Sequence, residues 1–254
     1  MTGRLVRPFV VDSACERYLF FTYASVQSCM RLDDPYALVT AYTRKMMAFL
    51  LFLPEPRHVL MIGLGGGSIA KFCYRHLPQT HITVVEINAD VISLRDQFSI
   101  PPDDERFEII HDDGGAYLAR VPPKVDVILV DAFDELGVAP SLASPDFYHQ
   151  ASQSLTLDGV LVVNLSGQKI RYPLHVQGLC EAFDGTVVLV PVQEDDNVLL
   201  FAFKRPPLTE VPQMLYERAT ELEEALGLEF HRFLQRLRAG PTLRTPFDLL
   251  VTGR

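Results

Sequence analysis

The stretch His58-Val-Leu-Met-Ile-Gly-Leu-Gly-Gly-Gly-Ser68 decides the fold class of this chain. The apolar run Val59–Ile62 indicates a buried strand, and the alternating glycines Gly63, Gly65 and Gly67 predict a tight turn before a helix. Glycine accepts positive φ and lets a ligand approach the backbone, while the first N–H groups of a helix are free to bind it. The motif therefore indicates a nucleotide-binding turn, with a purely structural turn as the alternative.

Working outward, short apolar runs alternate with helical segments from His58 onward, which is typical of a parallel sheet with crossover helices. We therefore expect an α/β, Rossmann-like fold with a seven-stranded, mostly parallel sheet whose last strand is antiparallel. The expected strands are Val59–Ile62, Ile82–Glu86, Phe107–Ile110, Val125–Val130, Val160–Asn164, Thr186–Val190 and Val198–Phe203, and the expected helices cover residues 67–77, 88–98, 113–120, 145–155 and 168–182.

The segments on either side have different patterns. Before residue 55, three β-prone runs predict a small antiparallel element, and Asp33-Asp34-Pro35 predicts the start of a helix that ends before Pro54. The runs are Leu5–Val11, Arg17–Phe21 and Val26–Met30. After residue 206, two helical stretches predict a tail that packs on the sheet domain or on a partner subunit. We expect three parts: a small β-hairpin and helix domain (1–54), a nucleoside-binding catalytic domain (55–206) and a helical extension (207–254).

Composition narrows the class of protein. With 254 residues, 48% hydrophobic and 22% charged, the chain is typical of a globular enzyme and unlike a disordered chain. The net charge of −9 argues against nucleic acid as a partner and suits a cationic ligand, although acidity also serves solubility. The longest apolar run, Met46–Leu53, is too short to cross a bilayer, so we expect a soluble cytoplasmic protein. The spacing of the cysteines and histidines indicates no metal site.

Acidic residues follow the ends of successive predicted strands. Glu86 closes the second strand, where an acid in such folds accepts hydrogen bonds from both ribose hydroxyls. Asp113, followed by Gly114, is placed to accept from an adenine amine or to cap a helix. Asp131 and Asp134 follow the fourth strand, and such a pair beside a nucleotide pocket can hold a cation and take its proton.

Together these motifs resemble the spermidine synthase family, the polyamine aminopropyltransferases with a class I methyltransferase-like fold. The similarity covers roughly Phe20 to Phe203. It is carried by Val26-Gln27, Tyr36, the glycine turn 63–67, Glu86, Asp113-Gly114, Asp131-Ala-Phe-Asp134, Asp146-Phe147-Tyr148 and Leu157-Asp-Gly159.

The resemblance implies roles for individual residues. Glu86 would bind the ribose of an S-adenosyl sulfonium donor and Asp113 its adenine. Gln27 and Tyr36 would close the active site. Asp131 would deprotonate the attacking amine with help from Asp134. The family also implies a homodimer formed partly by the N-terminal β element, decarboxylated S-adenosylmethionine as co-substrate, an amine acceptor such as putrescine, and no metal or permanently bound cofactor.

Two positions depart from the family pattern, and the first of them keeps other activities open. Gly66 stands where the family has an acid that contacts the aminopropyl chain of the donor, and Glu135 replaces a frequent proline. Because that acid would repel the carboxylate of intact S-adenosylmethionine, its loss leaves a methyltransferase or an aminocarboxypropyl transferase as the alternative. A non-catalytic nucleoside-binding protein is the third possibility.

Overall fold

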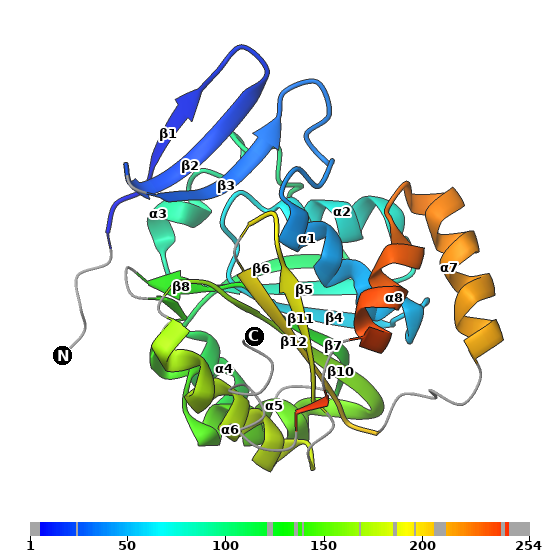
Figure 1. Ribbon diagram of the computed structural model, residues 1–254. Coiled ribbons are helices and arrows are strands. Elements are labelled where there is room, and N and C mark those ends of the chain that lie inside the picture. The colour runs from blue at the N-terminus through cyan, green and yellow to red at the C-terminus, as the bar shows by residue number, and fades with distance from the viewer. Residues whose placement is uncertain are drawn as a thin grey trace.

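The computed structural model describes residues 6–23, 25–120, 124–134, 137–138, 140–167, 169–184, 187–195, 197–205, 212–239 and 242–243. A large sheet forms the centre, with the strand order β13-β11-β12-β10-β7-β4-β5-β6 (Figure 1). Its strands are β4 (His58–Ile62), β5 (His81–Glu86), β6 (Phe107–His111), β7 (Val125–Val130), β10 (Leu155–Leu165), β11 (Val187–Val192), β12 (Asn197–Phe203) and β13 (Thr242–Leu243).

The direction of the strands confirms the predicted topology. β6, β5, β4, β7 and β10 are parallel, and β12 is antiparallel to both of its neighbours, β10 and β11. The central strands are mostly apolar because both faces of the sheet are covered. The two-residue strand β13 adds an eighth member, which the sequence did not indicate, by pairing with β11.

Helices cover both faces of the large sheet. One face packs against α4 (Gly114–Ala119), α5 (Pro145–Ser154) and α6 (Tyr172–Ala182). The other packs against α1 (Ala41–Met46), the 3-10 helix η1 (Met47–Leu51), α2 (Ser68–His76), α3 (Ala89–Ile92), α7 (Pro212–Leu226) and α8 (Phe230–Ala239). Two short 3-10 helices, η2 (Pro140–Leu142) and η3 (Lys169–Arg171), precede α5 and α6. The C-terminal helices therefore pack on the sheet domain of the same chain.

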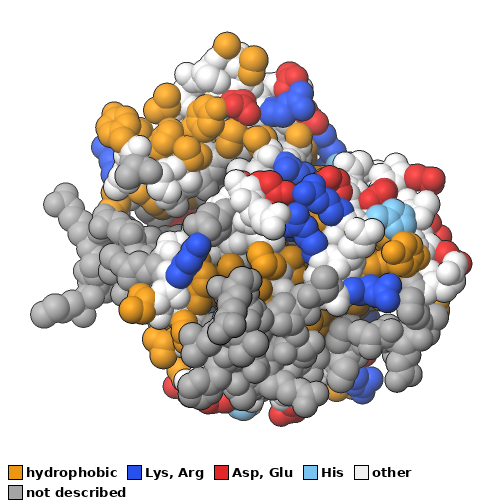
Figure 2. Space-filling model, viewed as in Figure 1, with side chains coloured by type: hydrophobic (Ala, Val, Ile, Leu, Met, Phe, Trp, Pro, Cys, Tyr) orange, Lys and Arg blue, Asp and Glu red, His pale blue; other side chains and the backbone are white. Residues whose placement is uncertain are grey.

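A separate three-stranded antiparallel sheet precedes these layers. It consists of β1 (Phe9–Asp12), β2 (Glu16–Thr22) and β3 (Ser25–Arg31), and it stands beside the carboxyl edge of the large sheet (Figure 1). Leu19 and Met30 anchor it in the main core. Hydrophobic side chains gather over this sheet on the face of the molecule that Figure 2 shows, and Val11, Tyr23 and Val26 are exposed.

The helix expected from Pro35 begins later than predicted. The side chain and the carbonyl of Asp34 accept hydrogen bonds from the N–H groups of Tyr36 and Ala37, which closes a turn instead of a helix. Helix α1 then begins after Thr40. Since η1 lies wholly within the main core, residues 41–51 pack with the large sheet, whereas the sequence-based division placed them in the N-terminal part.

A second difference lies in the segment 88–98. The structure has an α-helix only over α3 and continues as turns to Ser99, whose φ is 54°. A short antiparallel hairpin follows β7 and consists of the two-residue strands β8 (Phe133–Asp134) and β9 (Gly137–Val138).

Within the described residues, none of the helices has the length and hydropathy needed to span a membrane.

Candidate active site

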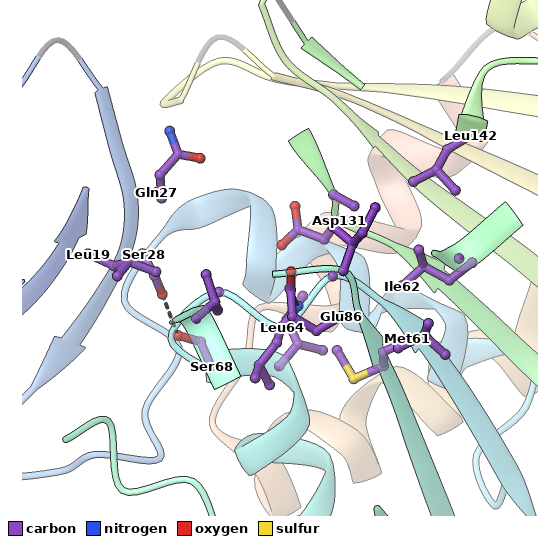
Figure 3. A pocket seen from close by; sticks show the side chains of 18 of the residues that line it. Leu19, Gln27, Ser28, Met61, Ile62, Leu64, Ser68, Glu86, Asp131 and Leu142 are labelled. Carbon is purple, nitrogen blue, oxygen red and sulfur yellow. Dashed lines mark hydrogen bonds between the residues drawn. The ribbon is translucent and has the colours of Figure 1, made fainter. Parts of the chain in front are cut away.

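A cavity opens where the carboxyl edge of the large sheet meets the small N-terminal sheet (Figure 3). The strands β2 and β3 line it on one side, and the ends of β4, β5 and β7 line it on the other. Ligands of open α/β sheets bind at this edge because the loops after the strands diverge there. Of the predicted site residues, the cavity lining includes Gln27, Gly63, Gly65, Glu86, Asp113, Gly114 and Asp131.

Glu86 lies at the end of β5 with its carboxylate held by backbone donors. Its Oε2 accepts a hydrogen bond from the N–H of Leu64 (2.8 Å), and its Oε1 accepts from the N–H of Asn88 (2.8 Å). Burial raises the pKa of Glu86, while these N–H groups lower it and so oppose the effect of burial. The N–H groups of Ile87 and Gly65 lower its pKa as well, and the side chain lines the cavity, where its oxygens can face the hydroxyls of a ligand.

Asp113 caps helix α4, as the alternative reading of the sequence proposed. Its Oδ1 accepts from the N–H of Ala116 (2.8 Å), and its Oδ2 accepts from the hydroxyl of Ser141 (2.9 Å). Gly114 follows, and a Cβ atom there would come within 2.4 Å of Ile62 Cγ2. The helix therefore approaches the end of β4 closely, and Asp113 is fixed at the rim of the cavity.

The glycine turn has two functions that the sequence did not distinguish. Gly63 and Gly65 line the cavity with positive φ values of 99° and 52°. Gly67 does not line the cavity. It stands at the N-terminus of α2 with φ 67°, where a Cβ atom would come within 2.6 Å of Ile100. Gly65 is therefore open to the cavity, with Ser28 Cβ 3.8 Å from an added Cβ, whereas Gly63 lets its backbone pack against that of Asp131 and Gly67 serves helix packing.

The space beside Gly66 is occupied by other side chains. A Cβ atom at this position would lie 2.6 Å from Ser28 Oγ and 2.8 Å from Phe98 Cδ1. The Ser28 hydroxyl also contacts the hydroxyl of Ser68, with the two oxygens 3.5 Å apart (Figure 3). The place of a larger residue is thus filled by the Ser28 hydroxyl from the small sheet and by the Phe98 ring.

Asp131 follows β7 and is held by two side chains that the sequence reasoning did not identify. The amide of Asn164 donates to its Oδ1 (2.9 Å), and the hydroxyl of Tyr42 donates to its Oδ2 (3.2 Å). Burial raises the pKa of Asp131, whereas both hydrogen bonds lower it. Burial and Asp131 together raise the pKa of Tyr42 well above 10, so its hydroxyl keeps the proton that it donates.

Tyr42, not Tyr36, is the tyrosine of this cavity. Tyr42 lines the cavity beside Asp131. Tyr36 does not line the cavity. Instead, its ring packs under the guanidinium of Arg75, whose Cζ lies 3.9 Å from the centroid of the ring. The turn closed by Asp34 moves the start of the helix, so the predicted tyrosine falls outside the site.

The remaining predicted residues are Gln27 and Asp134. Gln27 lies on the small sheet, across the cavity from Asp131 and Glu86 (Figure 3). Asp134 ends the short strand β8, and its side chain lies outside the part of the structure that is described. Asn164 could have been found from the sequence, because it directly follows the apolar run 160–163 and β10 is parallel to β7 with Val163 opposite Val130.

The charged side chains among the described lining residues are Glu86, Asp113 and Asp131. Three carboxylates in one cavity create a negative potential that attracts a cation. At the same time, the partly apolar lining, with Leu19 and Met61 among its residues, weakens solvent screening. The arrangement can bind a nucleoside through its hydroxyls and can accept a proton from an amine.

Comparison with known proteins agrees with this geometry. A family model for the spermine/spermidine synthase domain matches residues 39–177. A polyamine aminopropyltransferase of Chromobacterium violaceum is 40% identical over 224 residues, which cover 87% of this chain and 85% of the relative.

Two solved structures share the fold. Spermidine synthase from Thermotoga maritima has a TM-score of 0.64 at 20% identity over 91% of this chain and 84% of its own. Human methyltransferase-like protein 13, solved in complex with SAH, also has a TM-score of 0.64, at 24% identity over 78% of this chain and 93% of its own. The fold alone is therefore common to transferases of both kinds. Sequence similarity and the matched domain decide between them, and the chain belongs to the spermine/spermidine synthase family.

Proposed function

We propose that this protein is a polyamine aminopropyltransferase that moves an aminopropyl group from decarboxylated S-adenosylmethionine to an amine such as putrescine. The observation that carries the proposal is the position of Asp131, a buried carboxylate with two hydrogen-bond donors at the cavity wall. The curated relative with 40% identity is a polyamine aminopropyltransferase, which supports the same reaction.

The chemistry requires a base at this place. A primary amine with a pKa of about 10.4 is almost fully protonated at pH 7, so releasing the free base costs roughly 4–5 kcal/mol. Asp131 accepts that proton. The nitrogen lone pair then attacks the carbon next to the sulfonium, the carbon–sulfur bond breaks, and its electron pair neutralises the sulfur of the leaving methylthioadenosine.

The remaining residues bind and orient the two substrates. Glu86 accepts from the ribose hydroxyls, Asp113 stands at the adenine end, and Gln27 closes the cavity from the small sheet. Holding the amine against the reacting carbon supplies much of the rate acceleration. Asp134 helps to hold the acceptor amine in this proposal.

The charge of the cavity favours the decarboxylated donor even though Gly66 lacks an acidic side chain. A donor carboxylate would share the cavity with Glu86, Asp113 and Asp131, which all repel it. A donor that carries only an ammonium group meets no such repulsion. The acidic lining thus replaces part of the selection that an acid at position 66 would provide.

The decisive experiment incubates the purified protein with putrescine and either donor, and follows both nucleoside products by chromatography. We expect methylthioadenosine and the aminopropylated amine with the decarboxylated donor. Release of S-adenosylhomocysteine from intact S-adenosylmethionine would instead support a methyltransferase, and binding without any product would support a nucleoside-binding protein. Asp131→Asn should bind methylthioadenosine normally but turn over about 10²–10⁴ times more slowly.

Two further parts of the proposal concern assembly and location. The exposed hydrophobic side chains Val11, Tyr23 and Val26 on the small sheet favour a homodimer through this surface. Sedimentation of the parent and of Tyr23→Glu tests it, since the variant should shift toward the monomer. The free thiols Cys15, Cys29, Cys73 and Cys180 suit the reducing cytoplasm.

A further inference from the structure

The hairpin formed by β11 and β12 contacts the surroundings of Asp131 in two places. Asp195 lies between these strands, and Asn197 begins β12. Among the described residues, neither of these two forms a hydrogen bond with Asp131. Each, however, hydrogen-bonds to one of the two residues whose side chains donate to Asp131: Asp195 to the backbone N–H of Tyr42, and Asn197 to the side chain of Asn164.

The first connection runs through Asn164. The Nδ2 of Asn197 donates to Asn164 Oδ1 (3.0 Å), and Asn164 Nδ2 donates to Asp131 Oδ1 (2.9 Å). Asn164 and Asn197 are both buried, at 1% and 8% exposure, so their hydrogen bonds are protected from water. The bond from Asn197 opposes rotation of the Asn164 amide, which would turn its oxygen toward Asp131.

This orientation matters for the charge of the base. An Asn164 amide that presents its NH₂ group stabilises ionised Asp131, whereas a rotated amide presents oxygen and stabilises only the protonated acid. Asn197 therefore favours the ionised form of Asp131 through Asn164, although Asn197 itself does not contact the carboxylate.

The second connection runs through Tyr42. Thr40, the residue before α1, makes no side-chain cap. Instead, Asp195 Oδ2 accepts from the N–H of Tyr42 (2.7 Å), a contact between residues 153 positions apart. One turn later, the buried Lys45 pairs with Glu194, the neighbour of Asp195. Two contacts thus fix the turn of α1 that carries Tyr42, whose hydroxyl donates to Asp131 Oδ2.

We propose that the β11–β12 hairpin is the positioning element of the base: Asn197 acts on one oxygen of Asp131 through Asn164, and Asp195 acts on the other through Tyr42. The proposal rests on the role of Asp131 in the proposed function. The groups that face Asp131 are the Tyr42 hydroxyl from α1 and the neutral Asn164 amide from β10, and Asp195 is a further charge that acts on Tyr42.

The test measures the pH dependence of kcat/KM for Asn197→Leu and the turnover of Asp195→Ala. We expect Asn197→Leu to move the acidic limb of the profile upward by about half a pH unit to one unit, because ionised Asp131 loses support. Asp195→Ala should lower kcat about fivefold, and Asp195→Asn should restore it, since its amide oxygen can still accept from Tyr42 N–H. Gln193→Leu, an exposed position on the same hairpin, is the control and should match the parent.

Double variants show whether the effects pass through the intermediaries. In an Asn164→Leu background, Asn197→Leu should add no further shift, and in a Tyr42→Phe background, Asp195→Ala should add no further loss. Full additivity in either background would overturn that connection. Titration with methylthioadenosine confirms that each variant folds. If Asn197→Leu does not fold, Asn197→Ser takes its place.

Failure of this inference is distinguishable from failure of the proposed function. If Asp131→Asn retains full turnover, Asp131 is not the base and the proposed mechanism is wrong. If Asp131→Asn loses turnover but Asn197→Leu and Asp195→Ala behave like Gln193→Leu, the base assignment stands and the hairpin has no positioning role.

Discussion

The backbones of Gly63 and Asp131 lie so close that a Cβ atom on residue 63 would come within 2.2 Å of the Asp131 carbonyl oxygen. The same strands are joined by the hydrogen bond from Asp131 N–H to the carbonyl of Ile62 (2.9 Å). The glycine turn and Asp131 are therefore parts of one rigid junction between β4 and β7. A change in the turn must displace Asp131.

Gly63→Ala should consequently reduce both stability and activity. The side chain meets backbone atoms that cannot move independently, and φ is 99°, so we expect a loss of about 3 kcal/mol in the free energy of unfolding. Gly227→Ala is a matched control because Gly227 also has a positive φ, 66°, but has no atom within 4 Å of the added Cβ. Denaturant unfolding should show a loss of about 1 kcal/mol there. Equal losses in both variants would show that the close approach has no consequence.

Glu86→Gln tests the ribose site. The amide keeps the shape of the side chain but replaces one acceptor oxygen with a donor, so methylthioadenosine affinity should fall about thirtyfold, or about 2 kcal/mol. Calorimetry measures this directly. Glu108→Gln is the control, since Glu108 lies on the adjacent strand β6 outside the cavity lining. Unchanged affinity in Glu86→Gln would remove Glu86 from the nucleoside site.

Tyr42→Phe separates the two candidate tyrosines. Loss of the hydroxyl removes one donor to Asp131, so turnover should fall about tenfold while methylthioadenosine binding is retained. Tyr36→Phe should behave as the parent because Tyr36 packs under Arg75 away from the cavity. The opposite ranking in steady-state assays would restore the assignment made from the sequence.

The pH profile of the parent enzyme should reflect the environment of Asp131. Burial raises its pKa from 3.8, and only the ionised form accepts a proton. Activity should therefore disappear, as pH falls, at a higher pH than an ordinary aspartate would allow. The acidic limb of kcat/KM reports this value for the free enzyme. In Asp131→Asn, we expect this acidic limb to disappear and the slow remaining turnover to increase with pH.

Stability should depend on pH through Glu194. Its hydrogen bond with Lys45 lowers the pKa of Glu194 from 4.5 to about 2. A depressed folded pKa means that this stabilisation is complete above about pH 4.5 and is lost as pH falls toward about 2. Glu194→Gln should lose about 2 kcal/mol at pH 7, because Lys45 remains buried without its partner, with solvent screening of Glu194 limiting the loss. The difference from the parent should shrink in unfolding experiments at acidic pH, and a constant difference would contradict this linkage.

Much of the fold was predictable because its signals are local. A strand buried on both faces must be apolar along its length, so the seven main strands stand out in the sequence. The sequence also placed Glu86, Asp113 and Asp131 at strand ends, and parallel strands bring those ends to one edge. The eighth strand escaped prediction because two residues carry no periodicity, and β13 exists only by pairing with β11.

By itself, then, the sequence determined the sheet with helices on both faces, the glycine turn, and the acidic residues at the carboxyl edge of the sheet. Only the tertiary structure decided which tyrosine reaches Asp131, what fills the space beside Gly66, and that the β11–β12 hairpin contacts both residues that donate to Asp131. These features depend on contacts between distant segments, such as Asp195 with Tyr42 across 153 positions and Asn197 with Asn164 across 33. Such contacts leave no local pattern, because hydrogen bonding and steric fit depend on where the folded chain brings the groups together, not on their spacing along it.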